Sequence, residues 1–305
     1  MAIAKANNKA GNKPGNTASN TIAFQGEPGA NSDMACRASH PDLTPLPCPT
    51  FEAAMEAVRL GKAGLAMIPV ENSIAGRVAD LHSLLPHTTL KIVGEHFQRV
   101  EHCLVAVKGA TLKSIGSARS HVQALAQCRG FLKKHRVQPV AHADTAGAAK
   151  EIAALGDPAV AAIASSLAAR IYGLQVLARN IEDADHNTTR MLVFSRQTAS
   201  PDWRREPCIT AFLFRVKSRP AALYKALGGF ATNGVNITKL ESYISGAAFE
   251  QALFYAEVEG HPDQVGHALA FEELDFFSDH FKPLGTFPAN PFRRKGWDAP
   301  TRPGT

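Results

Sequence analysis

Between Thr21 and Ser195, short and almost wholly apolar segments alternate with segments of helical period. Apolar segments such as Ala63–Val70 lack the polar alternation of a half-exposed strand, so they are predicted to be strands buried on both faces. Strands of this kind that alternate with helices are typical of α/β proteins. Strands are predicted at 21–24, 63–70, 91–96, 102–107, around 117, and at 137–141, 159–164 and 191–195, and helices at 32–39, 51–60, 75–85, 121–135, 145–155 and 166–172.

A polar, proline-bearing stretch from Gln197 to Pro207 interrupts this alternation and indicates a linker. The pattern that follows predicts the order strand, helix, strand, strand, helix, strand, which is the order of a ferredoxin-like βαββαβ fold. The predicted organisation is a disordered tail over 1–19, a first domain over 20–197, a linker over 198–207, a second domain over 208–288 and a basic tail over 289–305.

The formal charge of +6 lies at the two ends of the chain. Residues 1–19 contribute +3 and residues 293–305 contribute +3, whereas residues 20–292 hold 26 basic and 26 acidic side chains. A neutral body is not expected to bind nucleic acid. No uncharged apolar stretch reaches the length of about 18 residues that a membrane helix needs, so no membrane association is expected. Five widely spaced cysteines and the lack of an apolar leader segment predict reduced thiols in a cytoplasmic protein.

Polar side chains follow several of the predicted strands, where ligands bind in α/β sheets. Each of them alone is what the N-cap of a helix requires. Together, hydroxyl and amide groups beside helix N-termini predict a site for a small anion, a carboxylate in particular. The sequence has neither a glycine-rich phosphate motif nor metal-ligand spacing, so no nucleotide, metal or other cofactor is expected. The polar positions are Asn31 and Ser32, Asn72 and Ser73, Ser120 and His121, Asp144 and Thr145, Ser165 and Ser166, and Asn187–Arg190.

Four of these segments resemble, in the same order, motifs of the monofunctional prephenate dehydratases: Pro69–Gly76, Ser120–Cys128, Asp144–Ala146 and Asn187–Arg190. The region after the linker resembles an ACT regulatory domain through Pro220–Leu227 and Asn236–Ser242. The resemblance spans residues 20–292. It implies a two-lobed α/β catalytic domain, similar to type II periplasmic-binding proteins, that is followed by a βαββαβ ACT domain.

The resemblance implies that prephenate loses carbon dioxide and water to give phenylpyruvate for phenylalanine synthesis. Thr189 matches the family's catalytic threonine and would hydrogen-bond the departing hydroxyl oxygen. Arg190 has two roles that fit equally well, pairing with a substrate carboxylate or bracing its loop through a structural ion pair. Glu71 is either an acid near the site or a surface residue. The residues expected to hold the substrate are Asn72, Ser73, Ser120, Gln123, Thr145, Ser165 and Arg190.

Several positions depart from the family pattern. Met191 stands in place of a phenylalanine, Val122 in place of a proline, and residues 26–32 differ from the usual first loop. In the ACT region, Ala221 replaces a glycine, and Tyr243 and Ile244 replace an arginine and a proline. The family binds phenylalanine between two ACT domains, so we expect feedback by phenylalanine and a homodimer or homotetramer. The residues expected at that site are Ala221, Ala222, Leu223, Glu241 and Ser242.

Two alternatives remain open at the level of sequence. The two-lobed receptors that the family resembles bind small carboxylates without catalysis, so a non-catalytic binding protein is one alternative. Arogenate, which carries an amine in place of the keto oxygen of prephenate, is the other possible substrate. The match at Thr189 and Arg190 favours catalysis.

Overall fold

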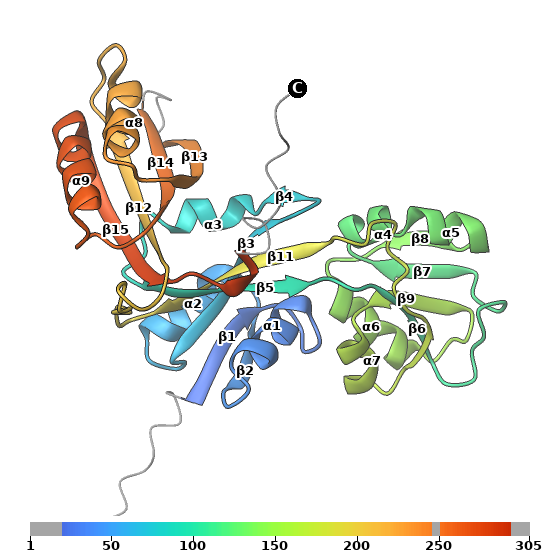
Figure 1. Cartoon of the computed structure of the whole chain (residues 1–305). Coiled ribbons are helices and arrows are strands. Elements are labelled where there is room, and N and C mark those ends of the chain that lie inside the picture. The colour runs from blue at the N-terminus through green and yellow to red at the C-terminus, as the bar shows by residue number, and fades with distance from the viewer. Residues whose placement is uncertain (1–19, 246–250, 294–305) are drawn as a thin grey trace, which may run out of the picture.

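The computed structural model describes residues 20–245 and 251–293. The predicted disordered tail over 1–19 and residues 294–305 of the predicted basic tail lie outside the described residues. The chain forms two lobes and a C-terminal domain (Figure 1).

The first lobe is built on a mixed sheet with the strand order β2-β1-β3-β11-β5. β1 is parallel to β2 and β3, whereas β11 is antiparallel to both β3 and β5. Ile22, Ile68 and Phe194 are completely buried, as the apolar strand pattern predicts. The elements are β1 (Thr21–Gln25), α1 (Asn31–Ser39), β2 (Thr44–Cys48), α2 (Phe51–Arg59), β3 (Leu65–Asn72), β4 (Gly76–Arg77), α3 (Ala79–Leu84), β5 (Lys91–Arg99) and β11 (Thr188–Ser195).

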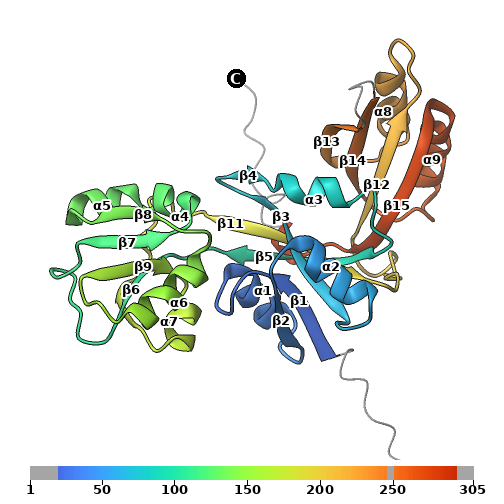
Figure 2. The ribbon, with the colours of Figure 1, turned by 180° about the vertical axis from the view of Figure 1, so that it is seen from behind.

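The second lobe is an insertion between β5 and β11, and these two neighbouring strands run toward it from the first lobe (Figures 1 and 2). Its sheet has the order β10-β6-β9-β7-β8. The polypeptide chain therefore enters the second lobe once, after β5, and returns to the first lobe once, at β11. Its elements are β6 (Cys103–Ala106), β7 (Ser117–Ser120), α4 (Val122–Gln127), α5 (Arg129–His135), β8 (Gln138–Ala141), α6 (Thr145–Leu155), β9 (Val160–Ala164), α7 (Ser166–Ile171) and β10 (Gln175–Ala178).

The C-terminal domain has the predicted βαββαβ order, and its antiparallel sheet runs β13-β14-β12-β15. One face of the sheet packs against α8 and α9 through a cluster that includes Phe212 and Phe230. The opposite face packs against the first lobe, where Tyr255 and Leu284 share a core with Leu81. The elements are β12 (Cys208–Val216), α8 (Ala222–Thr232), β13 (Ile237–Ser245), β14 (Gln251–Glu259), α9 (Val265–Phe277), β15 (Ser278–Pro288) and the 3₁₀ turn η2 (Pro291–Arg293).

The contact between β15 and β5 requires a residue without a side chain. A Cβ atom on Gly285 would lie 2.1 Å from the carbonyl oxygen of Ile92. The absence of a side chain thus lets the backbones of the C-terminal domain and the first lobe approach closely. The domain is consequently part of one packed body with the first lobe.

The α/β class and the βαββαβ order are confirmed, but several predicted elements differ in detail. The predicted helix 121–135 is two helices that meet at Cys128, and the predicted helix 75–85 begins with β4. β2 and β10 were not predicted. β2 has the sequence Thr-Pro-Leu-Pro-Cys, and proline is tolerated there because β2 is an edge strand. Cysteines are free thiols throughout the chain, and all are buried.

His82 on α3 lies in the interface with the C-terminal domain. Its ring lies 5.8 Å from that of Tyr243 and 5.7 Å from that of Tyr255, between centroids. The residue is only 4% exposed, and neither ring nitrogen has a hydrogen-bond partner. Burial lowers the pKa of His82, so the folded protein favours the neutral ring.

We expect His82→Phe to raise the free energy of unfolding by about 1 kcal/mol at pH 7, because it removes two unpaired buried nitrogen atoms. In the wild-type protein the unfolded chain binds a proton at His82 more readily, so stability falls as the pH drops below about 6.5. That part of the pH dependence should disappear in the variant. Urea unfolding between pH 5 and 8 measures both effects, with the exposed His280→Gln as control. An unchanged pH slope in His82→Phe would contradict this assignment.

Candidate active site

A cavity of about 580 Å³ lies between the two lobes. The first lobe contributes the end of β1, the start of α1 and the polar ends of β3 and β11, and the second lobe contributes the starts of α4 and α6. This is the sheet edge at which the sequence predicts an anion site. Residues of its wall include Asn31, Asn72, Arg77, Gln123, Thr145 and Thr189.

Thr189 and Asn72 form a hydrogen-bonded pair in the wall of this cavity. The Asn72 side-chain nitrogen donates to Thr189 Oγ1 at 2.9 Å. The Asn72 Oδ1 atom accepts from the backbone N–H groups of Ile74 and Ala75, at 3.0 and 2.8 Å, which fixes the orientation of the amide. Because Thr189 Oγ1 accepts this bond, its own O–H is free to donate to a group in the cavity.

A chain of side-chain hydrogen bonds extends from this pair into the second lobe. Asn187, which is fully buried, accepts from Asn72 at 2.8 Å and donates to Gln127 Oε1 at 2.9 Å. The same Gln127 oxygen lies 2.8 Å from His102 Nε2. Burial lowers the pKa of His102, which favours the neutral ring, so Nε2 is assigned as the donor. Asn72 and Thr189 are thus linked to both lobes.

Asn187 lies in one of the polar segments predicted to form the site, but neither Asn187 nor Gln127 is among the residues expected to hold the substrate. Both nevertheless stand inside the motifs that carry the resemblance, in Asn187–Arg190 and Ser120–Cys128. Both also line the cavity. The motif in Ser120–Cys128 contains Gln123 and Gln127, and its sequence alone does not tell which of the two joins the hydrogen-bond chain.

Four of the residues expected to hold or act on the substrate line the cavity, namely Asn72, Gln123, Thr145 and Thr189. Three serines that were also expected there are absent from the described wall. Ser73 Oγ donates to the His186 carbonyl at 2.8 Å, and Ser120 Oγ donates to that of Ile163 at 2.6 Å. Ser165 caps α7. Ser165 is thus an N-cap, as the alternative of local capping anticipates, whereas Ser73 and Ser120 bond carbonyl groups of distant segments.

The first loop, whose sequence departs from the family pattern, joins the two lobes. Ser165 Oγ donates to the Gly29 carbonyl at 2.5 Å, and Tyr172 Oη donates to that of Pro28 at 3.0 Å. Gly29 has a φ of +92°, and a Cβ atom there would lie 2.6 Å from Ala168 Cα. The glycine is therefore required by both conformation and space.

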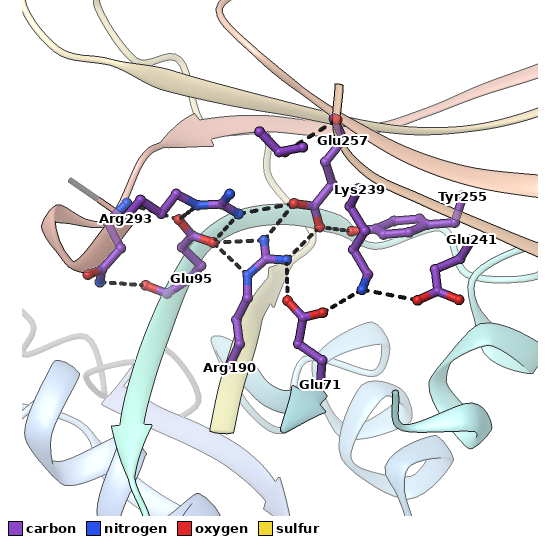
Figure 3. A network of polar contacts seen from close by, with 10 residues as sticks. Glu71, Glu95, Arg190, Lys239, Glu241, Tyr255, Glu257 and Arg293 are labelled. Atoms are coloured by element: carbon purple, nitrogen blue, oxygen red, sulfur yellow. Dashed lines mark hydrogen bonds and ion pairs between the residues drawn. The ribbon is translucent and has the colours of Figure 1, made fainter. Parts of the chain in front are cut away.

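Arg190 is absent from the described wall of the cavity, and its guanidinium group points into a cluster of carboxylates (Figure 3), a position that does not support the predicted contact with the substrate. Its guanidinium group donates to both carboxylate oxygens of Glu257 at 2.9 and 2.8 Å, to Glu95 at 2.8 Å and to Glu71 at 3.3 Å. Of the two roles considered, the structural ion pair is the one observed. Burial alone would lower the pKa of Arg190, but the charges of Glu257 and Glu95 reverse this effect and raise it.

Arg293, which is assigned from the sequence to the basic tail over 289–305, takes part in the same cluster. The Arg293 guanidinium lies 2.7 Å from Glu95 and 3.1 Å from Glu257. The backbone N–H of Asn290 donates to Glu95 at 3.0 Å. Arg293 thus compensates a buried carboxylate and does not add a free positive charge to a tail.

The residues expected at a phenylalanine site are not brought together within one chain. Ala221, Ala222 and Leu223 line a hollow of about 440 Å³ at the start of α8, whereas Glu241 and Ser242 lie on β13. Ala221 has a φ of +58°, a conformation that its glycine counterpart in the family adopts more easily. Glu241 instead lies 3.2 Å from Lys239 and 3.5 Å from Arg77 in the interface with the first lobe.

The family model for prephenate dehydratase matches residues 22–199 of the chain. The chain belongs to the prephenate dehydratase family. It is 51% identical over 274 residues to a bifunctional N-acyl-homoserine lactone acylase/prephenate dehydratase of Komagataeibacter europaeus, covering 90% of this chain and 98% of that protein. It is 36% identical over 281 residues to an arogenate dehydratase/prephenate dehydratase of Arabidopsis thaliana, covering 88% and 71%.

The chain is also similar to a solved structure of a prephenate dehydratase. The prephenate dehydratase of Arthrobacter aurescens in complex with L-Phe superposes with a TM-score of 0.80 at 30% identity, covering 88% of this chain and 90% of that one. Among the described residues no group of three or more His, Cys, Asp or Glu is arranged to hold a metal ion. No helix in the described part of the chain is long and apolar enough to cross a membrane.

Asn187→Ala should lower the free energy of unfolding by about 2 kcal/mol, because it removes two hydrogen bonds that the buried Asn187 amide makes, one to Asn72 and one to Gln127. Asn236→Ala, at an exposed position, serves as the matched control and should change stability by less than about 0.5 kcal/mol. Urea unfolding of the three proteins side by side provides the comparison. Equal stabilities of the two variants would show that the hydrogen bonds of Asn187 contribute nothing to the free energy of unfolding.

Proposed function

We propose that the chain catalyses the decarboxylating dehydration of prephenate to phenylpyruvate, carbon dioxide and water, as a step of phenylalanine synthesis. The observation that carries this proposal is the Thr189–Asn72 pair in the wall of the interlobe cavity. The pair leaves the Thr189 hydroxyl proton available to a bound molecule. Family membership supports the reaction type.

The proposed reaction needs help mainly at the departing oxygen. As the ring carboxylate leaves as carbon dioxide, its bonding electrons enter the ring and the ring hydroxyl departs, and it takes a proton from the solvent to become water. The product ring becomes aromatic, which supplies the driving force. A threonine hydroxyl is too weak an acid to be fully deprotonated near pH 7, but its O–H stabilises negative charge as it develops on the leaving oxygen.

Binding of a dianionic substrate needs positive potential in the cavity, and Arg190 does not supply it there. Arg77 is the only lysine or arginine among the described residues of the wall. Its side chain is about half exposed and lies 3.5 Å from Glu241, so it remains accessible to a ligand. We assign Arg77, with the starts of α1 and α6, to the attraction of substrate carboxylates. Gln123 and Thr145 are proposed to orient the substrate.

Arogenate stays the rival substrate, because the Arabidopsis relative is named for both dehydratase activities. A second activity is suggested by the relative of 51% identity, which is named as an acylase of N-acyl-homoserine lactones as well as a prephenate dehydratase. We propose prephenate as the substrate of the interlobe cavity. Release of fatty acid from an N-acyl-homoserine lactone should be assayed with the same preparations, so that monofunctional and bifunctional behaviour are distinguished.

We propose further that the C-terminal domain is an ACT domain that binds phenylalanine between two copies of the chain, as a homodimer or homotetramer. Its βαββαβ order and the L-Phe complex of the Arthrobacter protein support this. Ala221–Leu223 of one copy and Glu241 and Ser242 of the other would form the site. The five free cysteines are typical of a reducing compartment, and we propose that the protein acts in the cytoplasm.

Purified protein should convert prephenate to phenylpyruvate, detected by its ultraviolet absorbance. Thr189→Ala should lower kcat by about 10²- to 10³-fold, the usual effect of losing one donor to a developing oxyanion, while Thr189→Ser should keep much of the rate. Thr188→Ala, at the adjacent position that does not line the cavity, is the control. No turnover by the wild-type protein, or full rate in Thr189→Ala, would refute the proposal.

L-Phenylalanine should bind to the protein in isothermal titration and inhibit the dehydratase reaction. Because a left-handed alanine costs about 1 kcal/mol relative to glycine, Ala221→Gly should bind phenylalanine at least as well. Sedimentation velocity, with and without the amino acid, gives the oligomeric state. If millimolar phenylalanine produced no binding heat and no inhibition, this form of regulation would be excluded.

A further inference from the structure

We infer that two charged side chains of the C-terminal domain, Glu257 and Lys239, are positioning residues for the Thr189–Asn72 pair. This inference rests on the proposed function. Neither side chain lines the cavity, and each would act through a residue of the first lobe. Glu257 acts through Arg190 and Lys239 acts through Glu71.

The register of two strands brings these residues next to the cavity. Thr189 on β11 lies opposite Asn72 on β3, and Arg190 lies opposite Glu71 one step further along. Successive side chains of a strand point to opposite faces of a sheet. The second pair faces the C-terminal domain (Figure 3). The first pair therefore faces the cavity, whose wall includes both of its residues.

The backbone ladder between β11 and β3 is interrupted in this part of the sheet, whereas the ladder between β11 and β5 is regular from Thr188 to Val193. The register between β11 and β3 shifts between Arg190 and Met191, directly beside the catalytic pair. Such a bulge interrupts the ladder of hydrogen bonds and leaves the local strand geometry less constrained. Side-chain contacts to Arg190 and Glu71 are thus in a position to fix the distance between Thr189 and Asn72.

Contacts of the required kind come from the C-terminal domain. Glu257 on β14 is fully buried and binds Arg190 through both carboxylate oxygens, and it also accepts from Tyr255 Oη at 2.5 Å. Lys239 on β13, whose side chain is 10% exposed, lies 2.5 Å from Glu71. A bidentate pair defines the orientation of both partners more narrowly than a single contact does.

The charged contacts of Glu257 and Lys239 are better explained by a role in positioning β11 and β3 than by a role in attaching the C-terminal domain to the first lobe. The apolar cluster that contains Leu81, Tyr255 and Leu284 already joins the domain to the first lobe. Burying an ion pair costs desolvation that its attraction only partly offsets, so such pairs contribute little net stability but can specify one arrangement. The arrangement specified here is that of β11 and β3 at the catalytic pair.

The test compares Glu257→Gln and Lys239→Met with Glu273→Gln, a control on α9 of the same domain whose partner is Asn233. We expect kcat for prephenate to fall about 10- to 100-fold in Glu257→Gln, since small displacements of catalytic groups have effects of this size. A smaller fall is expected in Lys239→Met. KM should change less than about threefold in both, because neither residue contacts the substrate, and Glu273→Gln should match the wild type.

Side-chain amide NMR of the full chain gives a readout independent of activity. The Asn72 amide signal, assigned through its loss in Asn72→Asp, should shift in Glu257→Gln and stay unchanged in Glu273→Gln. Tyr255→Phe, which removes one hydroxyl only, covers the case in which Glu257→Gln does not fold, and it should shift the same signal. An inactive wild type would refute the proposed function alone, whereas an unmoved Asn72 signal with unchanged kcat in Glu257→Gln would overturn this inference.

Discussion

The Arg190 guanidinium is the centre of an ion-pair cluster that joins the first lobe to the C-terminal domain. It lies on β11 of the first lobe and is only 3% exposed, so its charge depends on the carboxylates around it. Glu71 and Glu95 come from neighbouring strands of the same sheet, and Glu257 comes from the C-terminal domain. Arg293, near the C-terminal end of the described chain, adds a second cation. Removal of any one partner would leave a buried charge uncompensated.

Two polar networks reach β11 and β3 from opposite faces of the sheet. The hydrogen-bond chain of His102, Gln127, Asn187 and Asn72 reaches Thr189 from the second lobe. The charged cluster reaches the same two strands from the C-terminal domain. Thr189 therefore depends on all three parts of the fold, although its side chain lines the cavity and accepts its hydrogen bond from Asn72. This arrangement also means that movement of β14 relative to β3 would change the geometry of the Thr189–Asn72 pair.

The elements that sequence predicts well are those whose pattern is local. α6 was predicted at its observed bounds because Asp144 caps it and Gly156 ends it in a left-handed conformation. The βαββαβ order followed from alternating apolar runs with clear turns between them. The edge strand β2 was missed because its prolines resemble a loop.

The candidate site was predictable only in part, since long-range partners decide which polar residues face the cavity. Arg190 had two equally good roles because its partners Glu95 and Glu257 lie 95 and 67 residues away in the sequence. Ser120 and Ser165 are polar residues at helix starts, as a binding residue would be. Their hydroxyl groups, however, donate hydrogen bonds to backbone carbonyl groups. Arg293 belonged to a charged segment by composition, and only the fold shows that it compensates buried carboxylates.

The central claim is that charges of the C-terminal domain fix the catalytic pair, and crystal structures of the wild type and of Glu257→Gln test it most directly. In the wild type, Asn72 Nδ2 and Thr189 Oγ1 should lie at hydrogen-bond distance, as they do here at 2.9 Å. In Glu257→Gln the two atoms should separate beyond about 3.5 Å, where the hydrogen bond is lost. An unchanged separation, with Arg190 still seated between Glu95 and Glu71, would contradict the account.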